Sequence, residues 1–530
     1  TYHSVDSGCA PMSELRIKKS TQNQLNAKFP VWLASLIALA AGSTFIFALA
    51  PYHIWIVALI SPALLYACLQ QRSAPQALLI GWCYGFGLWF VGAFWLYTSI
   101  HEYGDTSAAV SVLLIAIMAS LMALFSALQA WVYRRFFPET PLTFAPLWVF
   151  FEWAKTWVFT GFPWLFVGYA FTERFLDQYA PLFGVFGVSF IAITIACGLV
   201  EMVRRKWFWA VPIAVLLAGA WAASFLVFVQ PKAEKPLHVS LIQGNIPQDL
   251  KWLTSYQNRT LDIYHDLSAS EWGQDLVVWP ESSIPMPQTA IEPFLQDINR
   301  QALAKHSAWV TGIPYFDEAG SIKAQKPLFY NALMASGEQT SGLYQKQRLV
   351  PFGEYVPLAG LLKWVLPSLQ NDASAGGFSA GAAGQQPLSV KGHPLGAAIC
   401  YEVAYPNLTR INAEHSDFMV TVSNDAWFKG TAGPWQHLQM VQMRAKENGR
   451  WFIRATNTGV TAFIDAQGHI VKQAPQDKAF VLRGDLPAYT GQTLYNRLGN
   501  YPVLIFSGLL LLLSLRYRPR QIDVSFKSRR

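Results

Sequence analysis

The sequence predicts a membrane protein of two parts: a polytopic α-helical membrane domain of about eight spans, and an α/β sandwich domain placed before the last span. Composition is the first reason. Of the 530 residues, 52% are hydrophobic and only 14% are charged, which is too apolar a balance for a soluble protein. The second is a series of apolar runs. The third is a stretch, residues 231–500, in which short β-branched runs alternate with amphipathic segments, as they do in α/β domains.

The membrane domain is predicted to occupy residues 31–230 with seven spans, and residues 501–516 to form an eighth. Each run approaches the roughly 20 apolar residues that cross a bilayer as a helix, although the last is short and needs help from its flanks. The runs lie at about 31–49, 53–70, 77–98, 108–133, 142–160, 180–203, 207–229 and 501–515. Residues 161–179 are aromatic and broken by Pro163, so we expect an interfacial or re-entrant loop there.

The charges of the short loops predict the orientation. Basic residues favour the cytoplasmic side, and they follow the second, fourth, sixth and eighth runs: Arg72, Arg134, Arg135, Arg204, Arg205, Lys206, Arg516, Arg518 and Arg520. We therefore expect two cytoplasmic tails, residues 1–30 and the basic residues 517–530. Residues 231–500 then face outward, which is the periplasm if the source is a Gram-negative bacterium with this chain in its inner membrane.

The net charge of +8 does not indicate a nucleic-acid partner. Lys plus Arg and Asp plus Glu are equal in number within residues 231–500. The excess of basic residues therefore lies in the membrane part and the tails, where it reflects the orientation of the chain in the membrane. The polar residues 1–11, before Met12, are a tag or an unpatterned extension and are set aside.

Strands and helices alternate in residues 231–500. The expected strands are Leu237–Gln243, Leu276–Trp279, Trp309–Gly312, Tyr330–Ala335, Gly396–Cys400, Phe418–Ser423, Trp451–Ala455 and Val460–Asp465, and the expected helices are about 254–272, 290–306 and 434–449. Residues 370–387 are rich in Gly, Ala, Ser and Gln. We expect a loop there, and a long loop near a reactive residue is a candidate lid.

Cys400 is the candidate nucleophile. It ends the short apolar run Gly396–Cys400, and it is the only cysteine within residues 231–500, so no disulfide framework, CxxC pair or His/Cys metal cluster is indicated there. A thiol at the end of a buried strand is held rigidly and can face a cleft. The alternative is a buried structural thiol, which is common for free cysteine.

Two further stretches supply charged groups next to turn residues. Trp-Pro-Glu-Ser at 279–282 carries Glu281, and Lys-Gln-Arg-Leu-Val-Pro-Phe-Gly-Glu-Tyr-Val-Pro at 346–357 carries Lys346 and Glu354. A carboxylate can take the proton of a thiol, and an ammonium can stabilise an oxyanion. Taken singly, Glu281 could cap a helix, Lys346 could be a solvated surface residue and Glu354 could close a turn. The ordered trio with Cys400 favours catalysis.

These three motifs, in this order, resemble the nitrilase, or carbon–nitrogen hydrolase, superfamily with its Glu-Lys-Cys triad. The eight flanking runs narrow the resemblance to the apolipoprotein N-acyltransferase family of Gram-negative bacteria. Further motifs agree: Gln-Gly-Asn-Ile-Pro-Gln-Asp-Leu-Lys-Trp at 243–252, Ser-Asn-Asp-Ala-Trp-Phe at 423–428, Gly-Pro-Trp-Gln-His at 433–437 and Thr-Asn-Thr-Gly-Val-Thr-Ala at 456–462. The resemblance implies a nitrilase-like α-β-β-α sandwich for residues 231–500.

The resemblance also implies residue roles. Cys400 would be the nucleophile, Glu281 the general base and acid, and Lys346 the transition-state stabiliser. Supporting positions would be Glu354, Tyr401 and Glu402. Positions on the substrate-binding arm or lid would be Trp252, Asn424 and Trp427, although packing under the lid is an open alternative for the aromatic ones. No metal or cofactor is implied.

The implied reaction is acyl transfer. Cys400 would take a fatty acyl chain from a phospholipid, typically phosphatidylethanolamine, and pass it as a thioester to the N-terminal amine of an S-diacylglyceryl-cysteine lipoprotein. Two alternatives stay open. A membrane-tethered nitrilase-type amidase would use water as the acceptor, and a transport or binding protein would use the spans and leave the triad without a purpose.

Overall fold

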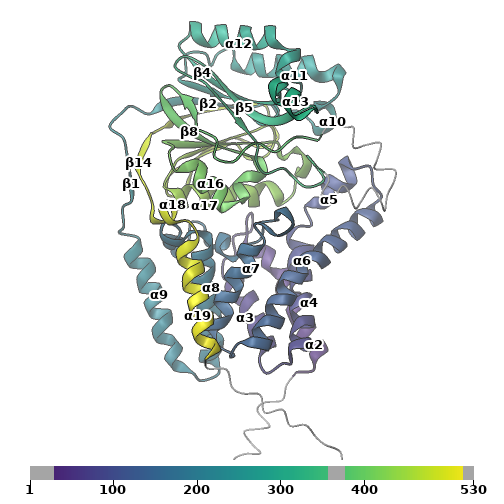
Figure 1. Ribbon diagram of the computed structural model, residues 1–530, viewed down its shortest axis with the longest axis vertical. Coiled ribbons are helices and arrows are strands. Elements are labelled where there is room, and N and C mark those ends of the chain that lie inside the picture. The colour runs from purple at the N-terminus through teal and green to yellow at the C-terminus, as the bar shows by residue number, and fades with distance from the viewer. Residues whose placement is uncertain (1–28, 356–376, 517–530) are drawn as a thin grey trace, which may run out of the picture.

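The computed structural model describes residues 29–355 and 377–516. It has a bundle of apolar helices at one end and an α/β domain at the other (Figure 1). Within the described residues, the chain enters at α2 and leaves at α19, and both of these ends lie at the end of the bundle that is far from the sheets. Most of the expected tails, residues 1–28 and 517–530, and residues 370–376 of the expected lid lie outside the described residues.

In the part of the chain that the structure describes, the bundle contains eight apolar helices. They are α2 (Val31–Thr44), α3 (Val57–Leu69), α4 (Ala74–Gly92), α6 (Ala108–Phe136), α7 (Pro141–Ala154), α8 (Ala180–Val203), α9 (Ala210–Ala223) and α19 (Tyr501–Leu515). Helix α4 packs between α2 and α6 through small residues. A Cβ added to Gly81 or Gly85 would clash with the backbone of α6, and one added to Gly87 would clash with α2, so close helix contact requires glycine there.

Not all of these helices are long enough to span a bilayer by themselves. In the described part of the chain, four helical stretches have the length and the hydropathy of a span: Val31–Ala48, Ala74–Gly92, Ala108–Phe136 and Phe175–Val203. Three shorter apolar helices accompany them at Val57–Leu69, Trp207–Ala223 and Tyr501–Leu515. The eight runs of the sequence thus correspond to helices, whereas four meet the requirement for crossing a membrane.

Residues 161–179 form an irregular segment, as expected from Pro163. It contains the short 3₁₀ helices η4 (Val167–Phe171) and η5 (Phe175–Tyr179), and its residues 163–172 are buried. The segment lies where the bundle meets the α/β domain. Its contacts to that domain are polar as well as apolar: the Trp164 indole donates to Gln436 at 2.7 Å, and Lys446 pairs with Asp177 at 2.6 Å.

The α/β domain holds two six-stranded sheets. The outer sheet, which is farther from the bundle, has the order β13-β2-β3-β4-β5-β6, and the inner sheet has the order β12-β11-β10-β9-β8-β7. The outer strands are β2 (Leu237–Gln243), β3 (Leu276–Val278), β4 (Ala308–Phe316), β5 (Phe329–Gly337), β6 (Gly342–Gln345) and β13 (Phe480–Leu486). The inner strands are β7 (Leu388–Val390), β8 (His393–Ile399), β9 (Phe418–Ser423), β10 (Phe452–Thr456), β11 (Ala462–Ile464) and β12 (Ile470–Gln473).

Helices cover both sheets, so the layers are α-β-β-α as expected. Helices α11 (Thr254–Ser268) and α12 (Glu292–Ala304) cover the outer sheet, and α16 (Pro406–Ala413) and α17 (Gly433–Asn448) lie between the inner sheet and the bundle. The space between the sheets is filled by aliphatic and aromatic side chains, among them Val239, Leu241, Val420 and Phe463. Burying such apolar surface contributes about 25 cal/mol per Å².

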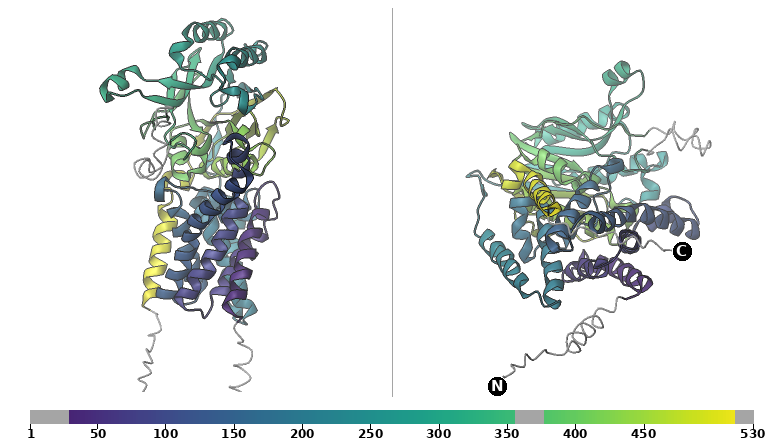
Figure 2. Two further views of the ribbon diagram at one scale, coloured as in Figure 1. Left: turned by 90° about the vertical axis from the view of Figure 1, so that its right-hand side faces the viewer. Right: turned by 60° about the horizontal axis from the view of Figure 1, so that its bottom comes forward.

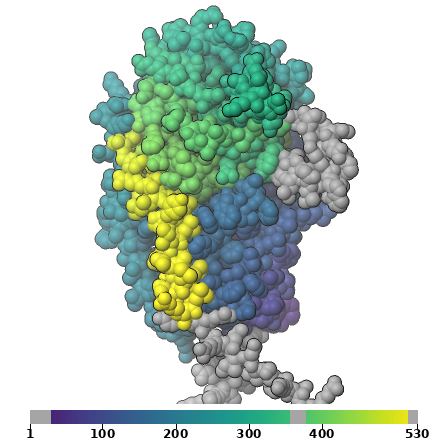
Figure 3. All heavy atoms as spheres, viewed as in Figure 1, coloured from purple at the N-terminus to yellow at the C-terminus, as the bar shows by residue number. Residues whose placement is uncertain are grey.

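The two connections between bundle and α/β domain run side by side. Strand β1 (Val229–Pro231) follows α9 and pairs antiparallel with β14 (Tyr489–Gly491), which leads through α18 (Leu494–Leu498) to α19. The short helices α5 (Leu96–Thr98), η2 (Ser99–Tyr103) and α10 (Gln248–Lys251) lie on the other side of the molecule, and α13 (Glu318–Ala324) extends from the β4–β5 connection. Figure 3 shows α19 on the surface along the bundle, directly below the α/β domain.

Candidate active site

The three predicted triad residues follow strands that end at the same edge of the sandwich. Strands β2, β3 and β4 run parallel, as do β8, β9 and β10. Strand β6 runs in the direction of β4, because both pair antiparallel with β5. Glu281 comes shortly after β3, Lys346 directly after β6 and Cys400 directly after β8. Carboxyl ends of parallel strands are the usual place for a site in such folds.

Cys400 stands outside the strand that was predicted to include it. Strand β8 ends at Ile399, and Cys400 begins the 3₁₀ helix η8 (Cys400–Ala404) with φ at 52°. A left-handed backbone at a residue other than glycine is strained and is held in place by its surroundings. Two bonds hold it here. The Ile399 amide donates to Glu402 at 2.7 Å, and His437 Nε2 lies 2.9 Å from the Cys400 carbonyl oxygen.

Glu281 and Lys346 form a buried ion pair. Lys346 Nζ lies 3.1 Å from Glu281 Oε1 and 2.9 Å from Glu354 Oε1. Asn331, on β5, donates to both carboxylates at 2.8 Å, and the backbone amide of Asn424 donates to Glu281 Oε2 at 3.0 Å. The lysine is thus held between two carboxylates, and both oxygens of Glu281 have donors, as buried charges require.

Glycine allows the outer sheet to approach this pair. Strand β4 passes behind the turn that carries Glu281, and a Cβ on Gly312 would collide with the Pro280 carbonyl and with Cα of Glu281. Any larger residue at 312 would push the carboxylate away from Lys346. The position of Glu281 therefore depends on a glycine in β4, the strand next to β3.

The charges set the resting protonation states. Burial alone would raise the pKa of Glu281, but the Lys346 ammonium, the Asn331 amide and the Lys251 ammonium outweigh it and lower that pKa. Burial opposes the charge of Lys346, yet Glu281 and Glu354 raise its pKa well above the usual value. Burial and the Glu281 charge raise the pKa of Cys400. The resting site is therefore carboxylate, ammonium and neutral thiol, so Glu281 is ready to accept the thiol proton as the sulfur attacks.

The supporting residues lie around this centre. Glu402 is buried and accepts hydrogen bonds from the backbone amides of Ile399, Gln347 and Arg348 at 2.7, 2.6 and 3.2 Å. Burial raises its pKa to about 7, although these amides oppose the shift. The Tyr401 hydroxyl donates to the Gly161 carbonyl at 3.1 Å. Glu402 thus ties the turn after β8 to the segment after Lys346, and Tyr401 ties it to the bundle.

The three expected arm or lid residues occupy different environments. Trp252 follows α10 and is 45% exposed, and Trp427 is 36% exposed with its ring 5.5 Å from that of Tyr103. Asn424 is buried instead, and its side-chain amide donates to Gln248 at 2.6 Å. The two tryptophans therefore expose apolar surface, whereas Asn424 is enclosed and its backbone amide binds Glu281.

Several residues at the centre were not expected from the sequence. Lys251 is buried and donates to the backbone carbonyl of Glu281 at 3.1 Å. The charges of Glu281 and Cys400 raise its pKa, which opposes the effect of burial. Asn331 carries no sequence signal, since it lies inside a strand. Ser423 and Asp425 fall within the quoted Ser-Asn-Asp-Ala-Trp-Phe motif, whose polar residues at a strand end could have singled them out. The Ser423 hydroxyl lies 3.4 Å from Cys400 Sγ.

A second buried network lies beneath Cys400. Asp425 Oδ2 is 2.7 Å from Arg454 Nη2, and its Oδ1 is 3.2 Å from His437 Nδ1. Burial opposes the Asp425 charge, but Arg454 and His437 lower its pKa to about 2. Ligand atoms of Cys400, Asp425 and His437 lie within 4.8 Å of one another. The guanidinium already neutralises this carboxylate, so the cluster is built around an arginine rather than around a metal ion.

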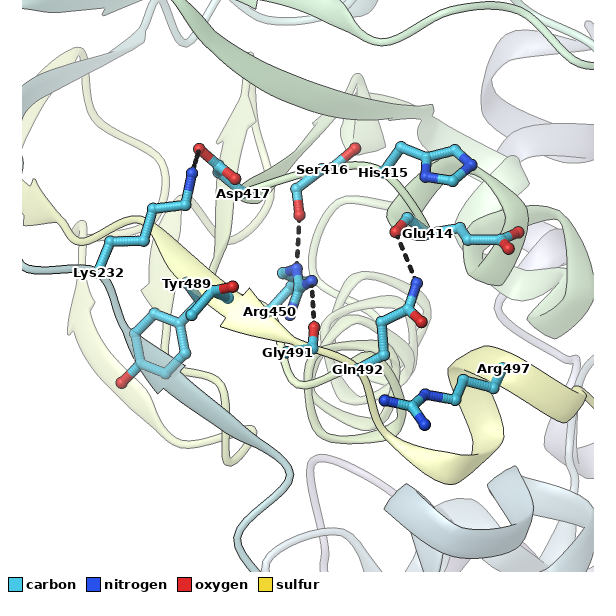
Figure 4. A pocket seen from close by; sticks show the side chains of 11 residues that line it. Lys232, Glu414, His415, Ser416, Asp417, Arg450, Tyr489, Gly491, Gln492 and Arg497 are labelled. Atoms are coloured by element: carbon cyan, nitrogen blue, oxygen red, sulfur yellow. Dashed lines mark hydrogen bonds and ion pairs between the residues drawn. The ribbon is translucent and has the colours of Figure 1, made fainter.

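A polar hollow elsewhere in the α/β domain has a structural role. It measures about 370 Å³ and is lined by residues next to β14, none of them from the triad. Three of its charged side chains bind within the chain (Figure 4): Lys232 pairs with Asp417 at 2.7 Å, and Arg450 donates to the Ser416 and Gly491 carbonyls at 2.5 and 2.7 Å. These bonds join the β1–β14 connection to the inner sheet.

Comparison with known proteins places both parts of the chain in one family. Residues 41–198 match the model of the apolipoprotein N-acyltransferase N-terminal domain, and residues 238–495 match that of the carbon-nitrogen hydrolases. An apolipoprotein N-acyltransferase of Pseudomonas putida is 40% identical over 495 residues, which cover 91% of this chain and 96% of that protein. The one from Photobacterium profundum is 36% identical over 495 residues, covering 91% and 94%.

A solved structure is similar as well. Nit3 of Saccharomyces cerevisiae, a member of the nitrilase superfamily, is 17% identical with a TM-score of 0.36, covering 48% of this chain and 91% of that chain. The sequence matches extend over bundle and sandwich alike and include the stretches that carry Glu281, Lys346 and Cys400. The chain belongs to the apolipoprotein N-acyltransferase family.

Proposed function

We propose that this protein transfers a fatty acyl chain from a phospholipid to the N-terminal amine of an S-diacylglyceryl-cysteine lipoprotein, through a thioester on Cys400. One observation carries the proposal: a complete Glu-Lys-Cys centre lies where the α/β domain meets an apolar helical bundle. The turn after Cys400 is bound to the bundle through the hydroxyls of Tyr401 and Tyr405, which donate to the Gly161 carbonyl at 3.1 and 3.2 Å. A site at this junction can take substrates whose reacting ends lie at a bilayer surface.

The first half-reaction acylates the enzyme. The Cys400 sulfur attacks the ester carbonyl carbon as the thiol proton moves to Glu281. The resulting oxyanion is stabilised by the Lys346 ammonium and by the backbone N–H of Tyr401. As the tetrahedral intermediate collapses, the carbon–oxygen bond to the lysophospholipid breaks, and the leaving oxygen takes the proton from Glu281. The products are a thioester on Cys400 and a lysophospholipid.

The second half-reaction returns the enzyme to its resting state. The neutral α-amine of the lipoprotein cysteine attacks the thioester carbonyl and gives a proton to Glu281. The carbon–sulfur bond then breaks, an amide forms, and Cys400 regains its proton from Glu281. Between the two steps the thioester must avoid water. Exposed tryptophans beside the site, Trp252 and Trp427, offer an apolar surround that a lipid chain can complete.

The proposal includes an arrangement in the membrane. All eight apolar helices would cross the bilayer or penetrate it deeply, the sandwich would lie in the periplasm, and the acyl donor would typically be phosphatidylethanolamine. An even number of crossings agrees with the two described ends lying at the same end of the bundle. The basic loops support a cytoplasmic position for that end. Reporter fusions at Gln230 and Arg530 should therefore report opposite sides, and the same side for both would contradict the arrangement.

The decisive experiment separates transfer from hydrolysis. Full-length protein incubated with phospholipid alone should carry one fatty acyl group on the Cys400 peptide, measured by mass, with little free fatty acid released. A diacylglyceryl-cysteine peptide should then discharge it with ping-pong kinetics. Cys400→Ala should form no adduct. Steady release of fatty acid with no acyl-Cys400 at any time would favour a membrane-tethered amidase or hydrolase instead.

A further inference from the structure

The peptide bond between Cys400 and Tyr401 is held through its carbonyl oxygen. Cys400 has a left-handed backbone, with φ at 52°, and its carbonyl oxygen lies 2.9 Å from His437 Nε2. In a trans peptide the C=O and the next N–H point in opposite directions in one plane. Fixing the Cys400 carbonyl therefore fixes the direction of the Tyr401 N–H, which is the backbone donor that the proposed oxyanion requires.

His437 is itself held in a defined orientation. It lies on α17, is buried, and has Nδ1 at 3.1 Å from Arg454 Nη2 and 3.2 Å from Asp425 Oδ1. Arg454, on β10, pairs with Asp425 at 2.7 Å. Gly459, with φ at 111°, lies against Asp425, and a Cβ there would crowd its carboxylate. The ring is thus fixed by Arg454 on β10 and by Asp425, which follows β9 and lies against a glycine turn.

The partners of Nδ1 determine what Nε2 can do. A neutral imidazole that accepts from the Arg454 guanidinium at Nδ1 must carry its proton on Nε2. A cationic imidazole that donates to Asp425 at Nδ1 also has a proton on Nε2. In either state Nε2–H donates to the Cys400 carbonyl. The bond to the nucleophile therefore does not depend on the charge of the histidine.

We propose that His437 is a positioning residue, which turns the Cys400–Tyr401 peptide so that the Tyr401 N–H faces the oxyanion. The inference rests on the proposed acyl transfer, because only that reaction forms an oxyanion at this point. Its consequence is specific. Loss of the His437 bond should slow reactions of Cys400 that pass through an oxyanion and should leave reactions that do not pass through one nearly unchanged.

Two reactions of Cys400 make this distinction measurable. Acylation by a phospholipid develops an oxyanion, whereas alkylation by iodoacetamide displaces iodide and develops none. Both can be followed as mass changes of the Cys400 peptide in the full-length protein, so the other cysteines do not interfere. Three variants are informative. His437→Phe removes the donor, His437→Gln places an amide N–H near the position of Nε2, and His437→Asn has an amide that is too short to reach it.

A matched control exists on the same helix. Gln442 is buried on α17 and donates from its side chain to the Gly468 carbonyl at 2.9 Å, the same kind of bond to a carbonyl outside the site. Gln442→Leu therefore reports the cost of losing such a bond without affecting Cys400. We expect it to acylate at the wild-type rate, within about twofold.

The expected pattern is a split between the two reactions. Misplacing one oxyanion donor costs about 10²–10³ in rate when the loss is complete. His437→Phe and His437→Asn should lose about 10²-fold in acylation and less than about threefold in alkylation. His437→Gln should recover to within about tenfold of wild type in acylation. If His437→Phe does not fold, the comparison of Gln with Asn decides the question.

Three results would overturn the inference: wild-type acylation in His437→Phe, equal rates in His437→Gln and His437→Asn, or equal losses in acylation and alkylation. The last would mean that His437 positions the sulfur, or the fold as a whole, rather than the oxyanion donor. Failure of the wild-type protein itself to form acyl-Cys400 is a separate outcome, which would contradict the proposed function.

Discussion

The outer and inner halves of the sandwich contribute different parts of the site. The outer sheet and the loops that follow its strands provide the charged groups, Glu281, Lys346 and Glu354, whereas the inner sheet provides Cys400. The helices that cover the two sheets differ as well. On α12 only Ile298 and Ala302 are buried, while on α17 every residue except Trp435 is buried. One half faces solvent, and the other is enclosed between a sheet and the bundle (Figures 1 and 2).

This difference between the two halves shows how the helical bundle can support the site although it contributes none of the three triad residues. Polar side chains of α17 bind the bundle directly: Gln439 accepts from the Ala50 amide at 3.0 Å, and Glu447 accepts from the Val185 amide at 2.6 Å. The same helix presents His437 to Cys400. Cys400 is thus fixed relative to the bundle through α17, while the outer half carries Glu281, Lys346 and the exposed Trp252.

The comparison between the inner and outer halves predicts its largest effect on the free energy of unfolding, for a variant of the inner half. Arg444, on α17, pairs with Glu447 at 2.9 Å, and both side chains are fully buried. Arg444→Met leaves a buried glutamate without its partner, which typically costs roughly 3–5 kcal/mol. We expect a clear fall in the apparent melting temperature of the detergent-solubilised protein. Arg300→Met on α12 is the matched control, because that arginine is 75% exposed and 3.5 Å from Asp297, and exposed pairs contribute about 0–1 kcal/mol. Equal shifts for the two variants would break the comparison.

The outer half should respond in rate as well as in stability, because Lys346 is a buried cation between two carboxylates. Lys346→Met keeps the chain length and removes the charge that faces Glu281. Removing one oxyanion donor costs about 10²–10³ in rate, so the single-turnover rate of Cys400 acylation at saturating phospholipid should fall by that factor. A normal rate at saturation with weaker phospholipid binding would make Lys346 a binding residue instead. Lys305→Met, at an exposed lysine of the outer half, should leave the rate unchanged.

Much of the α/β fold could be predicted because buried strands leave a local signal. Residues Leu237–Gln243 and Phe418–Ser423 form strands with the predicted bounds, since each is an apolar run between polar turns. Strand β13, Phe480–Leu486, was missed. Its residues alternate between exposed and buried, and Arg483, Gly484 and Asp485 hide the pattern. The short strands β6 and β7 pair with their neighbours in the chain, β5 and β8. They were missed because runs of four and three residues are too short to show an alternating pattern.

The residues of the candidate site likewise fall into those that a sequence motif could indicate and those that depend on tertiary packing. Glu281, Lys346 and Cys400 stand beside proline, glycine or tyrosine in compact motifs, so a resemblance could single them out. Asn331 could not be predicted, because its role depends on β5 passing between Glu281 and Glu354. His437 ends the quoted Gly-Pro-Trp-Gln-His motif, but the motif did not indicate its role. Its contact with the Cys400 carbonyl arises only when α17 packs beneath the turn after β8.

A smaller effect is expected on the exposed arm. Trp252 is 45% exposed beside the site, and Lys251 Nζ lies 5.9 Å from its ring centre. If the indole covers the acyl chain, Trp252→Ala should lower kcat/KM for phospholipid about tenfold, since burying a large apolar side chain contributes about 1.5–3 kcal/mol. Alkylation of Cys400 by iodoacetamide should remain unchanged. Trp207→Ala, at a 66% exposed tryptophan of the bundle, is the control. An unchanged kcat/KM in Trp252→Ala would reject the arm.

The smallest predicted effect is a pH dependence that belongs to the outer half alone. Lys251 is buried beside Glu281, and burial lowers its pKa to about 8, although the Glu281 and Cys400 charges oppose the shift. Below about pH 8 the site therefore holds a second ammonium near the developing negative charge, and above that pH the ammonium loses its proton. Cys400 acylation should fall several-fold as the pH rises through 8, which is less than the loss of a direct oxyanion donor.

Lys251→Met should already be slower by a similar factor at pH 7 and should show no fall near pH 8. Single-turnover rates between pH 6 and 9.5, with phospholipid alone so that no acceptor amine titrates, measure both profiles. The same fall near pH 8 in Lys251→Met would assign the titration to another group, and the outer half would then act through Glu281, Lys346 and Glu354 without a second ammonium.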